Sequence, residues 1–132
     1  MAGRFGACIE LMRPKNLILA GATVPLGAYF GLMDSSEAFP YLAVALHTLA
    51  VITFTGAGNS MNDIKDADID KAAHPMRPLP SGRLSVDEAR RFTALLWCVS
   101  VMSHIGGLMV VSADVSVYLP TALIYVLAVA LM

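Results

Sequence analysis

The sequence predicts an all-α protein, a polytopic bundle of transmembrane helices, and two observations carry this prediction. First, 57% of the 132 residues are hydrophobic and only 14% are charged, whereas about 25% of the residues of a soluble domain are usually charged. Second, four long stretches contain no Asp, Glu, Lys or Arg. Because a transmembrane helix needs about 20 mostly apolar residues, we expect four spans, at about 16–33, 39–61, 92–113 and 115–132.

The basic residues predict how these spans are oriented. All nine Lys and Arg residues lie either before the first span or between the second and the third, and the two other connections contain none. The positive-inside rule places such basic segments in the cytoplasm. We therefore expect a multi-pass protein of the cell membrane with a cytoplasmic amino terminus and a cytoplasmic loop at 62–91. The net charge of −1 offers no basic surface to nucleic acid.

A polar cluster follows the second expected span. Six Asn and Asp residues fall within the 12 residues from Asn59 to Asp70. If the helix continues through them, Asn62, Asp66 and Asp70 share one face at steps of four, and Asp63 lies beside them. Neighbouring carboxylates raise one another's pKa unless a cation neutralises them. Oxygen ligands suit a hard divalent ion, and Mg²⁺ completes its shell with water and substrate phosphate.

This cluster therefore predicts a Mg²⁺ site at Asp63, Asp66 and Asp70 together with a phosphorylated ligand. The alternative is an acidic helix end that is simply solvated. The next segment contains Lys71, His74, Arg77 and Arg83 between three prolines, which restrict the shapes of the loop. Guanidinium groups match phosphate oxygens in pairs, so the loop predicts diphosphate binding. Its alternative is a basic loop that only obeys the positive-inside rule.

The start of the third helix has a local signal of its own. Ser85 precedes Asp87 and Glu88, and serine followed by acids in the first turn is typical of a capped helix amino terminus. We expect this helix to lead into the third span.

Three motif blocks resemble a known family. Asn62, Asp63, Asp66 and Asp70 match the pattern N-D-x-x-D-x-x-x-D, residues 77–83 match R-P-x-P-S-G-R, and residues 10–16 form the opening E-L-M-R-P-K-N. In these blocks the chain resembles the UbiA superfamily of intramembrane prenyltransferases. The resemblance implies one domain over 1–132, the amino-terminal half of a bundle with four helices present of about nine expected.

The resemblance also implies a second aspartate-rich motif, which this chain lacks because Asp114 is its only acid after Glu88. The last expected span also ends at Met132 without a polar flank, although interfacial residues usually follow a span. We therefore expect either a longer protein, whose other half supplies the second motif, or a second chain that covers this end.

The implied function is Mg²⁺-dependent transfer of a prenyl group, geranylgeranyl, from an allylic diphosphate to a hydroxyl of a glycerol phosphate lipid in ether-lipid synthesis. Residues 56–59 and the opening look most like archaeal digeranylgeranylglyceryl phosphate synthases. Chlorophyll synthases and 4-hydroxybenzoate polyprenyltransferases share parts of the pattern, so an aromatic or chlorophyll-type acceptor is the alternative. The implied catalytic residues are Asp66, Asp70 and Asn62, the metal ligands are Asp63, Asp66 and Asp70, and the substrate-binding residues are Arg13, Asn16, Asn59, Lys71, Arg77 and Arg83.

Two other classes compete with this interpretation. The CDP-alcohol phosphatidyltransferases also use intramembrane aspartates, but only the last part of their pattern, Asp66 and Asp70, is present here. The second class is a non-enzymatic membrane partner or an inactive fragment. A transporter would place its acids at the bilayer midplane, whereas these acids lie at one edge of a span.

Overall fold

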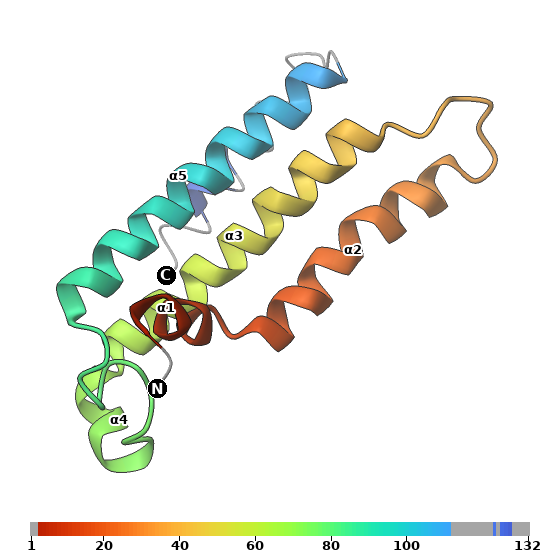
Figure 1. Cartoon of the computed structure of the whole chain (residues 1–132). Coiled ribbons are helices and arrows are strands. Elements are labelled where there is room, and N and C mark those ends of the chain that lie inside the picture. The colour runs from red at the N-terminus through yellow and green to blue at the C-terminus, as the bar shows by residue number, and fades with distance from the viewer. Residues whose placement is uncertain (1–2, 112–122, 124, 128–132) are drawn as a thin grey trace.

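The computed structural model describes residues 3–111, 123 and 125–127. These residues form helices and no strand, which confirms the all-α fold class for the described part of the chain. In chain order the helices are α1 (Arg4–Met12), α2 (Pro14–Leu32), α3 (Tyr41–Lys65), α4 (Ala67–Ala73) and α5 (Val86–Val110), as Figure 1 shows.

The three long helices lie side by side, with α3 between α2 and α5 (Figure 1). Small residues let these helices approach closely. A Cβ atom added at Gly21 of α2 would lie 2.9 Å from Ile52 Cδ1 of α3, and one added at Gly107 of α5 would collide with the His47 ring. Larger side chains at these two glycines would therefore push the helices apart.

Two of the helices are long and apolar enough to cross a membrane. These are α3 and α5, each 25 residues long. The first expected span, at 16–33, falls on α2, which has 19 residues and Pro25 inside it. It is not one of the two helices that are long and apolar enough to cross a membrane. Most of the fourth expected span, at 115–132, lies outside the described residues. The number of spans in the described part therefore stays a prediction.

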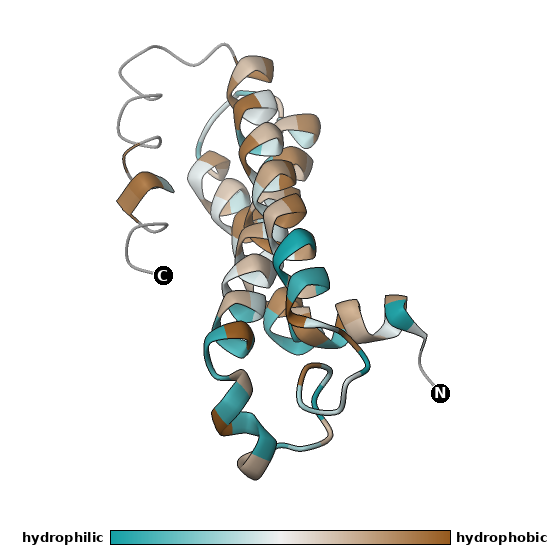
Figure 2. Ribbon diagram, turned by 90° about the vertical axis from the view of Figure 1, so that its left-hand side faces the viewer, coloured by the Kyte–Doolittle hydropathy of each residue, from teal (hydrophilic) through white to brown (hydrophobic). Residues whose placement is uncertain are grey.

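The outer sides of the long helices are apolar. Large side chains such as Ile18 and Leu19 of α2 are more than 70% exposed, and Met102 of α5 is 68% exposed. Figure 2 shows hydrophobic residues along the length of the bundle and hydrophilic residues gathered at the end that carries α4. This distribution fits a bundle whose sides face lipid and whose one end faces water.

Helix α1 lies across the end of the bundle, roughly perpendicular to α3 and α5 (Figures 1 and 2). Ala7 and Leu11 of α1 are fully buried in a core cluster with Leu84 and Ala89. The helix ends at Arg13, whose φ of 57° and ψ of 74° are left-handed, and α2 begins at once with Pro14. The opening block 10–16 therefore spans a break between two helices instead of starting one.

The start of α5 has the predicted cap. Ser85 Oγ accepts the Glu88 backbone N–H at 3.2 Å, and Glu88 Oε2 accepts the Ser85 backbone N–H at 2.9 Å, which completes a capping box. This reciprocal pairing satisfies backbone donors that a helix start otherwise leaves free. The structure thus confirms that the helix begins just after Ser85.

Replacing Ser85 with Ala should lower the free energy of unfolding by about 1 kcal/mol, the usual cost of a lost serine cap. We expect faster amide hydrogen exchange in the first turn of α5, at Val86–Ala89, because that turn frays without its acceptor. Ser85→Thr keeps the hydroxyl and serves as the control. Equal exchange in the two variants would contradict the capping role.

Candidate functional site

The polar end of α3 contains a kink inside the aspartate-rich motif. Helix α3 ends at Lys65, Asp66 has φ −89° and ψ 4°, and α4 starts at Ala67. The backbone hydrogen bonds from Asp66 N to Asn62 O (2.9 Å) and from Asp70 N to Asp66 O (2.8 Å) cross this kink. The helix therefore does not continue unbroken through 62–70, which was the condition for placing Asn62, Asp66 and Asp70 on one face.

The motif contains both buried and exposed residues. The side chains of Asp63 and Asp70 are each 6% exposed, whereas Asn62 and Asp66 are exposed. A carboxylate taken out of water needs a partner of opposite charge or hydrogen bonds. The two buried aspartates should therefore be paired.

Two arginines supply these partners. Arg13 Nη2 donates to Asp63 Oδ1, and Arg77 Nη1 donates to Asp70 Oδ2 at 2.6 Å. Arg77 Nη1 also lies 3.8 Å from Asp63 Oδ1, so it links the two aspartates. We call Arg13, Asp63, Asp70 and Arg77 the Arg–Asp cluster. It joins the α1–α2 break, the end of α3, α4 and the following loop.

The charges of the Arg–Asp cluster hold Arg77 firmly protonated. The hydrogen bond to Asp70 raises the pKa of the Arg77 guanidinium above its ordinary value, and the nearby charges of Asp63 and Asp66 act in the same direction, while burial opposes them. The Oδ2 atom of Asp63 and the Oδ1 atom of Asp70 accept no hydrogen bond from the described residues. These oxygens are hard ligands of the kind that divalent cations prefer.

The cluster alone does not form a complete cation cage. In the described part of the chain, no three His, Cys, Asp or Glu side chains lie close enough together to hold a metal ion. Mg²⁺ is often bound through only one or two carboxylates, with water and substrate phosphate completing its shell. One or two of the carboxylates of Asp63, Asp66 and Asp70 would suffice for that mode of binding.

Arg83 forms a separate ion pair with Glu10 of α1, which we call the clasp. Its Nη1 and Nη2 donate to Glu10 Oε2 at 2.7 Å and Oε1 at 3.0 Å, a paired geometry that suits guanidinium and carboxylate. Nη2 also donates to Met76 O at 2.7 Å, and Nε donates to Ser81 Oγ at 3.1 Å. The Glu10 carboxylate raises the pKa of Arg83. Two of these four hydrogen bonds thus hold the loop against α1, and the other two lie within the loop.

Replacing Glu10 with Gln should loosen this clasp. The pair is about one third to one half exposed (32% and 46%), so its loss should lower the free energy of unfolding only slightly. We expect faster amide hydrogen exchange at residues 77–84, because the loop loses its anchor on α1. Glu37→Gln, at an exposed acid between α2 and α3, is the control. Unchanged exchange in the Glu10 variant would show that the clasp does not order the loop.

The remaining predicted site residues lie in different surroundings. Asn59 Nδ2 donates to Met12 O at 2.8 Å, so it binds the last turn of α1 to α3. Lys71 Nζ pairs with Asp68 Oδ1 at 2.8 Å on the exposed side of α4, and this pairing lowers the pKa of Asp68. Asn16 is exposed in the first turn of α2. The structure thus gathers Arg13, Asp63, Asp70 and Arg77 but leaves Lys71 and Asn16 outside the cluster.

Sequence reasoning assigned no role to Glu10, the partner of Arg83. The two residues are 73 positions apart, so no local spacing indicates their pairing. The only signal was that Glu10 opens one of the three motif blocks.

The fold and the site define an all-helical membrane protein with paired arginines and aspartates at one end of an apolar bundle. Residues 22–132 match the UbiA prenyltransferase family, and the chain belongs to this family, as the resemblance of the motif blocks predicted. No solved structure matches the chain.

Similar curated proteins include archaeal enzymes named digeranylgeranylglyceryl phosphate synthase. The protein of Methanosarcina mazei is 38% identical over 103 residues, which cover 71% of this chain and 36% of the relative. That of Methanosphaera stadtmanae is 32% identical over 91% of this chain and 41% of the relative. That of Methanothermobacter thermautotrophicus is 38% identical over 80% and 37%, respectively. The matched region thus spans less than half the length of each of these relatives.

Proposed function

We propose that this chain carries the diphosphate-binding part of a prenyltransferase that transfers a geranylgeranyl group to a hydroxyl of a glycerol phosphate lipid. The family and the name shared by the relatives support the reaction class and the acceptor. The single observation that carries the proposal is the Arg–Asp cluster, which sets arginines beside hard oxygen ligands at the polar end of an apolar bundle.

The metal in this proposal is Mg²⁺, held by Asp63, Asp66 and Asp70, with one or two of them bound directly and the rest through water. When bound, it would neutralise charge on the diphosphate. Asp66 is the exposed member of the set, so its carboxylate is free to approach the ion without breaking a buried pair. Asn62, one turn earlier and also exposed, would orient the ligands through its amide.

The arginines of the cluster would receive the diphosphate. Arg77 and Arg13 have side chains that are 33% and 38% exposed, so part of each guanidinium faces solvent while the rest contacts Asp63 or Asp70. Preorganised cations stabilise charge that develops in the transition state. Lys71, Asn16 and Asn59 would contribute at the rim, and Arg83 would act by holding the loop on Glu10.

The reaction breaks the C–O bond between the allylic carbon and the diphosphate, and the bonding electron pair leaves with the diphosphate. The acceptor hydroxyl then forms the new C–O bond, and its proton goes to the released diphosphate or to water. The apolar sides of α2, α3 and α5 would exclude water from the allylic cation.

The proposal includes an orientation and a further contribution to the site. The amino terminus and the segment 62–91 would lie on the cytoplasmic side, where the basic residues gather. A second aspartate-rich motif would come from another part of the protein or from a second chain.

The test is prenyl transfer by the protein expressed from its complete reading frame and reconstituted in vesicles. Radiolabelled geranylgeranyl diphosphate is offered with a geranylgeranylglyceryl phosphate acceptor or with 4-hydroxybenzoate. We expect an ether-lipid product only with the first acceptor, its loss with EDTA, and its return with added Mg²⁺. A product with 4-hydroxybenzoate alone would move the assignment to aromatic acceptors, and no product with either would reject it.

A further inference from the structure

Helix α1 has an outer face that the rest of the described chain does not cover. Phe5 is 80% exposed and Ile9 is 39% exposed. The two side chains are one helical turn apart, so they lie on the same side of the helix. The opposite side, with Ala7 and Leu11, is fully buried against Leu84 and Ala89. The helix is therefore fixed in place while it presents an apolar strip outward.

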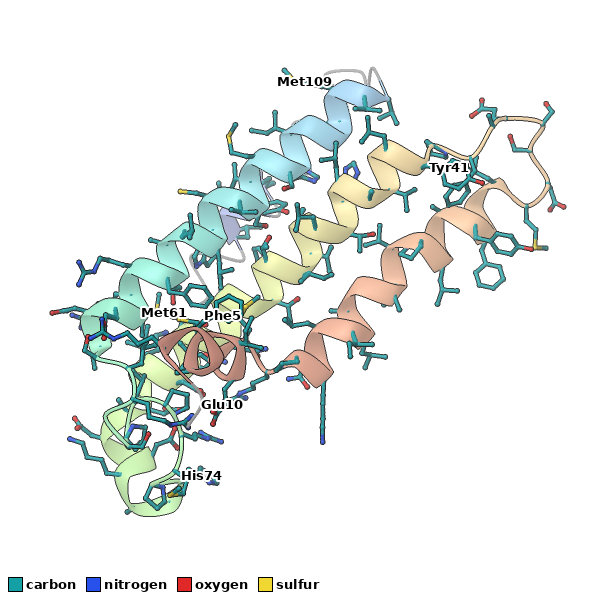
Figure 3. All side chains as sticks on the ribbon, in the orientation of Figure 1. Phe5, Glu10, Tyr41, Met61, His74 and Met109 are labelled. Atoms are coloured by element: carbon teal, nitrogen blue, oxygen red, sulfur yellow. The ribbon has the colours of Figure 1, made fainter. Side chains whose placement is uncertain are left out.

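The position of α1 shows what this strip meets. The helix lies across the bundle, roughly perpendicular to α3 and α5, at the level where apolar residues give way to hydrophilic ones (Figure 2). Figure 3 labels Phe5 at the edge of α1 that lies nearer the apolar length of the bundle, and Glu10 at the opposite edge, nearer His74. Apolar and polar residues of α1 thus point in the directions in which a bilayer and the water beside it would lie.

Basic residues lie near both ends of α1. The side chain of Arg4 is 83% exposed at the start of α1, where its Nη1 lies 3.4 Å from Glu88 Oε1, and Lys15 is exposed in the first turn of α2. Basic residues beside an amphipathic helix are attracted by anionic phospholipid headgroups. We propose that α1 is an interfacial helix that docks Phe5 and Ile9 into the headgroup layer of an anionic leaflet, with Arg4 of α1 and Lys15 of α2 beside the headgroups.

Docking of α1 would fix the candidate site to the membrane surface. Glu10 of α1 holds Arg83, and Met12 O at its end accepts from Asn59. Arg13, which follows directly, donates to Asp63. The depth of α1 in the leaflet therefore sets the height of the loop and the Arg–Asp cluster above the lipid.

The experiment measures that depth with nitroxide labels. In the protein expressed from its complete reading frame, Cys8 and Cys98 are replaced with Ala, and single cysteines are placed at Phe5 or Ile9. Asp68, which is 92% exposed on α4, gives the water reference, and Met102 on the outer side of α5 gives the lipid reference. Collisions with oxygen and with a water-soluble nickel chelate are measured in vesicles of phosphatidylcholine and phosphatidylglycerol.

We expect labels at Phe5 and Ile9 to collide more with oxygen and less with nickel than the label at Asp68, and less with oxygen than the label at Met102. In vesicles of phosphatidylcholine alone, both labels should become shallower. Collision rates equal to those at Asp68 would overturn the proposal, because the face would then lie in water. Shielding from both reagents would also overturn it, because protein would then cover the face. An unchanged depth without phosphatidylglycerol would reject the role of anionic lipid.

Discussion

Asp66→Asn should lower the rate of prenyl transfer by roughly 10²–10³-fold, the loss that follows removal of one preorganised group at a charged transition state. Asp66 is exposed at the kink between α3 and α4 and makes no side-chain hydrogen bond within the described residues. The substitution therefore removes a carboxylate without opening the Arg–Asp cluster. The measurement is turnover of reconstituted protein with Mg²⁺ as the sole divalent metal.

Asp68→Asn is the matched control, because Asp68 lies two residues further on but is 92% exposed and paired with Lys71. We expect this variant to turn over at the parent rate. If both variants retain that rate, Asp66 has no role in metal or diphosphate binding. Equal losses in both would indicate a general effect of negative charge on α4.

Arg77→Ala should cause the largest loss of stability, about 2–3 kcal/mol. It removes the cation that contacts both Asp63 and Asp70, whose side chains are 6% exposed. Removing one partner of a buried pair leaves an uncompensated charge, which costs about 3–5 kcal/mol, and the 33% exposure of Arg77 reduces this figure. The measurement is unfolding of the purified protein in detergent.

Two further variants distinguish the effect of an unpaired buried charge from the loss of an ordinary exposed ion pair. Arg90→Ala breaks the exposed ion pair in which Arg90 Nη1 lies 3.3 Å from Asp87 Oδ1. It should lower the free energy of unfolding by no more than ~0.5 kcal/mol. Adding Asp70→Asn to Arg77→Ala should recover part of the loss, because one buried charge is then gone. If the double variant is as unstable as the sum of the two single ones, the residues do not interact.

The sequence predicted the features that depend only on residues close together in the chain. The cap at Ser85 and the start of α5 depend on residues three positions apart, so a single stretch of sequence contains the whole interaction. The long apolar segments likewise indicated α3 and α5, because length and lack of charge alone favour a membrane span.

The sequence did not predict the features that depend on packing between distant residues. Asp63 and Arg13 are 50 residues apart, and they meet only because α1 folds across the end of α3. The kink at Asp66 was missed because residues on both sides favour helix and the spacing of four does not reveal it. The separate helix α1 was missed because nine residues are too few for a clear hydrophobic period.

Two structural requirements conflict at Arg13, which lies between α1 and α2. Its left-handed backbone, with φ 57°, is a conformation that glycine adopts readily and that is unfavourable for larger residues. Its guanidinium is required by the carboxylate of Asp63. Glycine would relax the turn and lose the cation, and lysine would keep the cation while giving up the planar fork. Any attempt to engineer a more stable version of this protein must therefore accept a compromise at position 13.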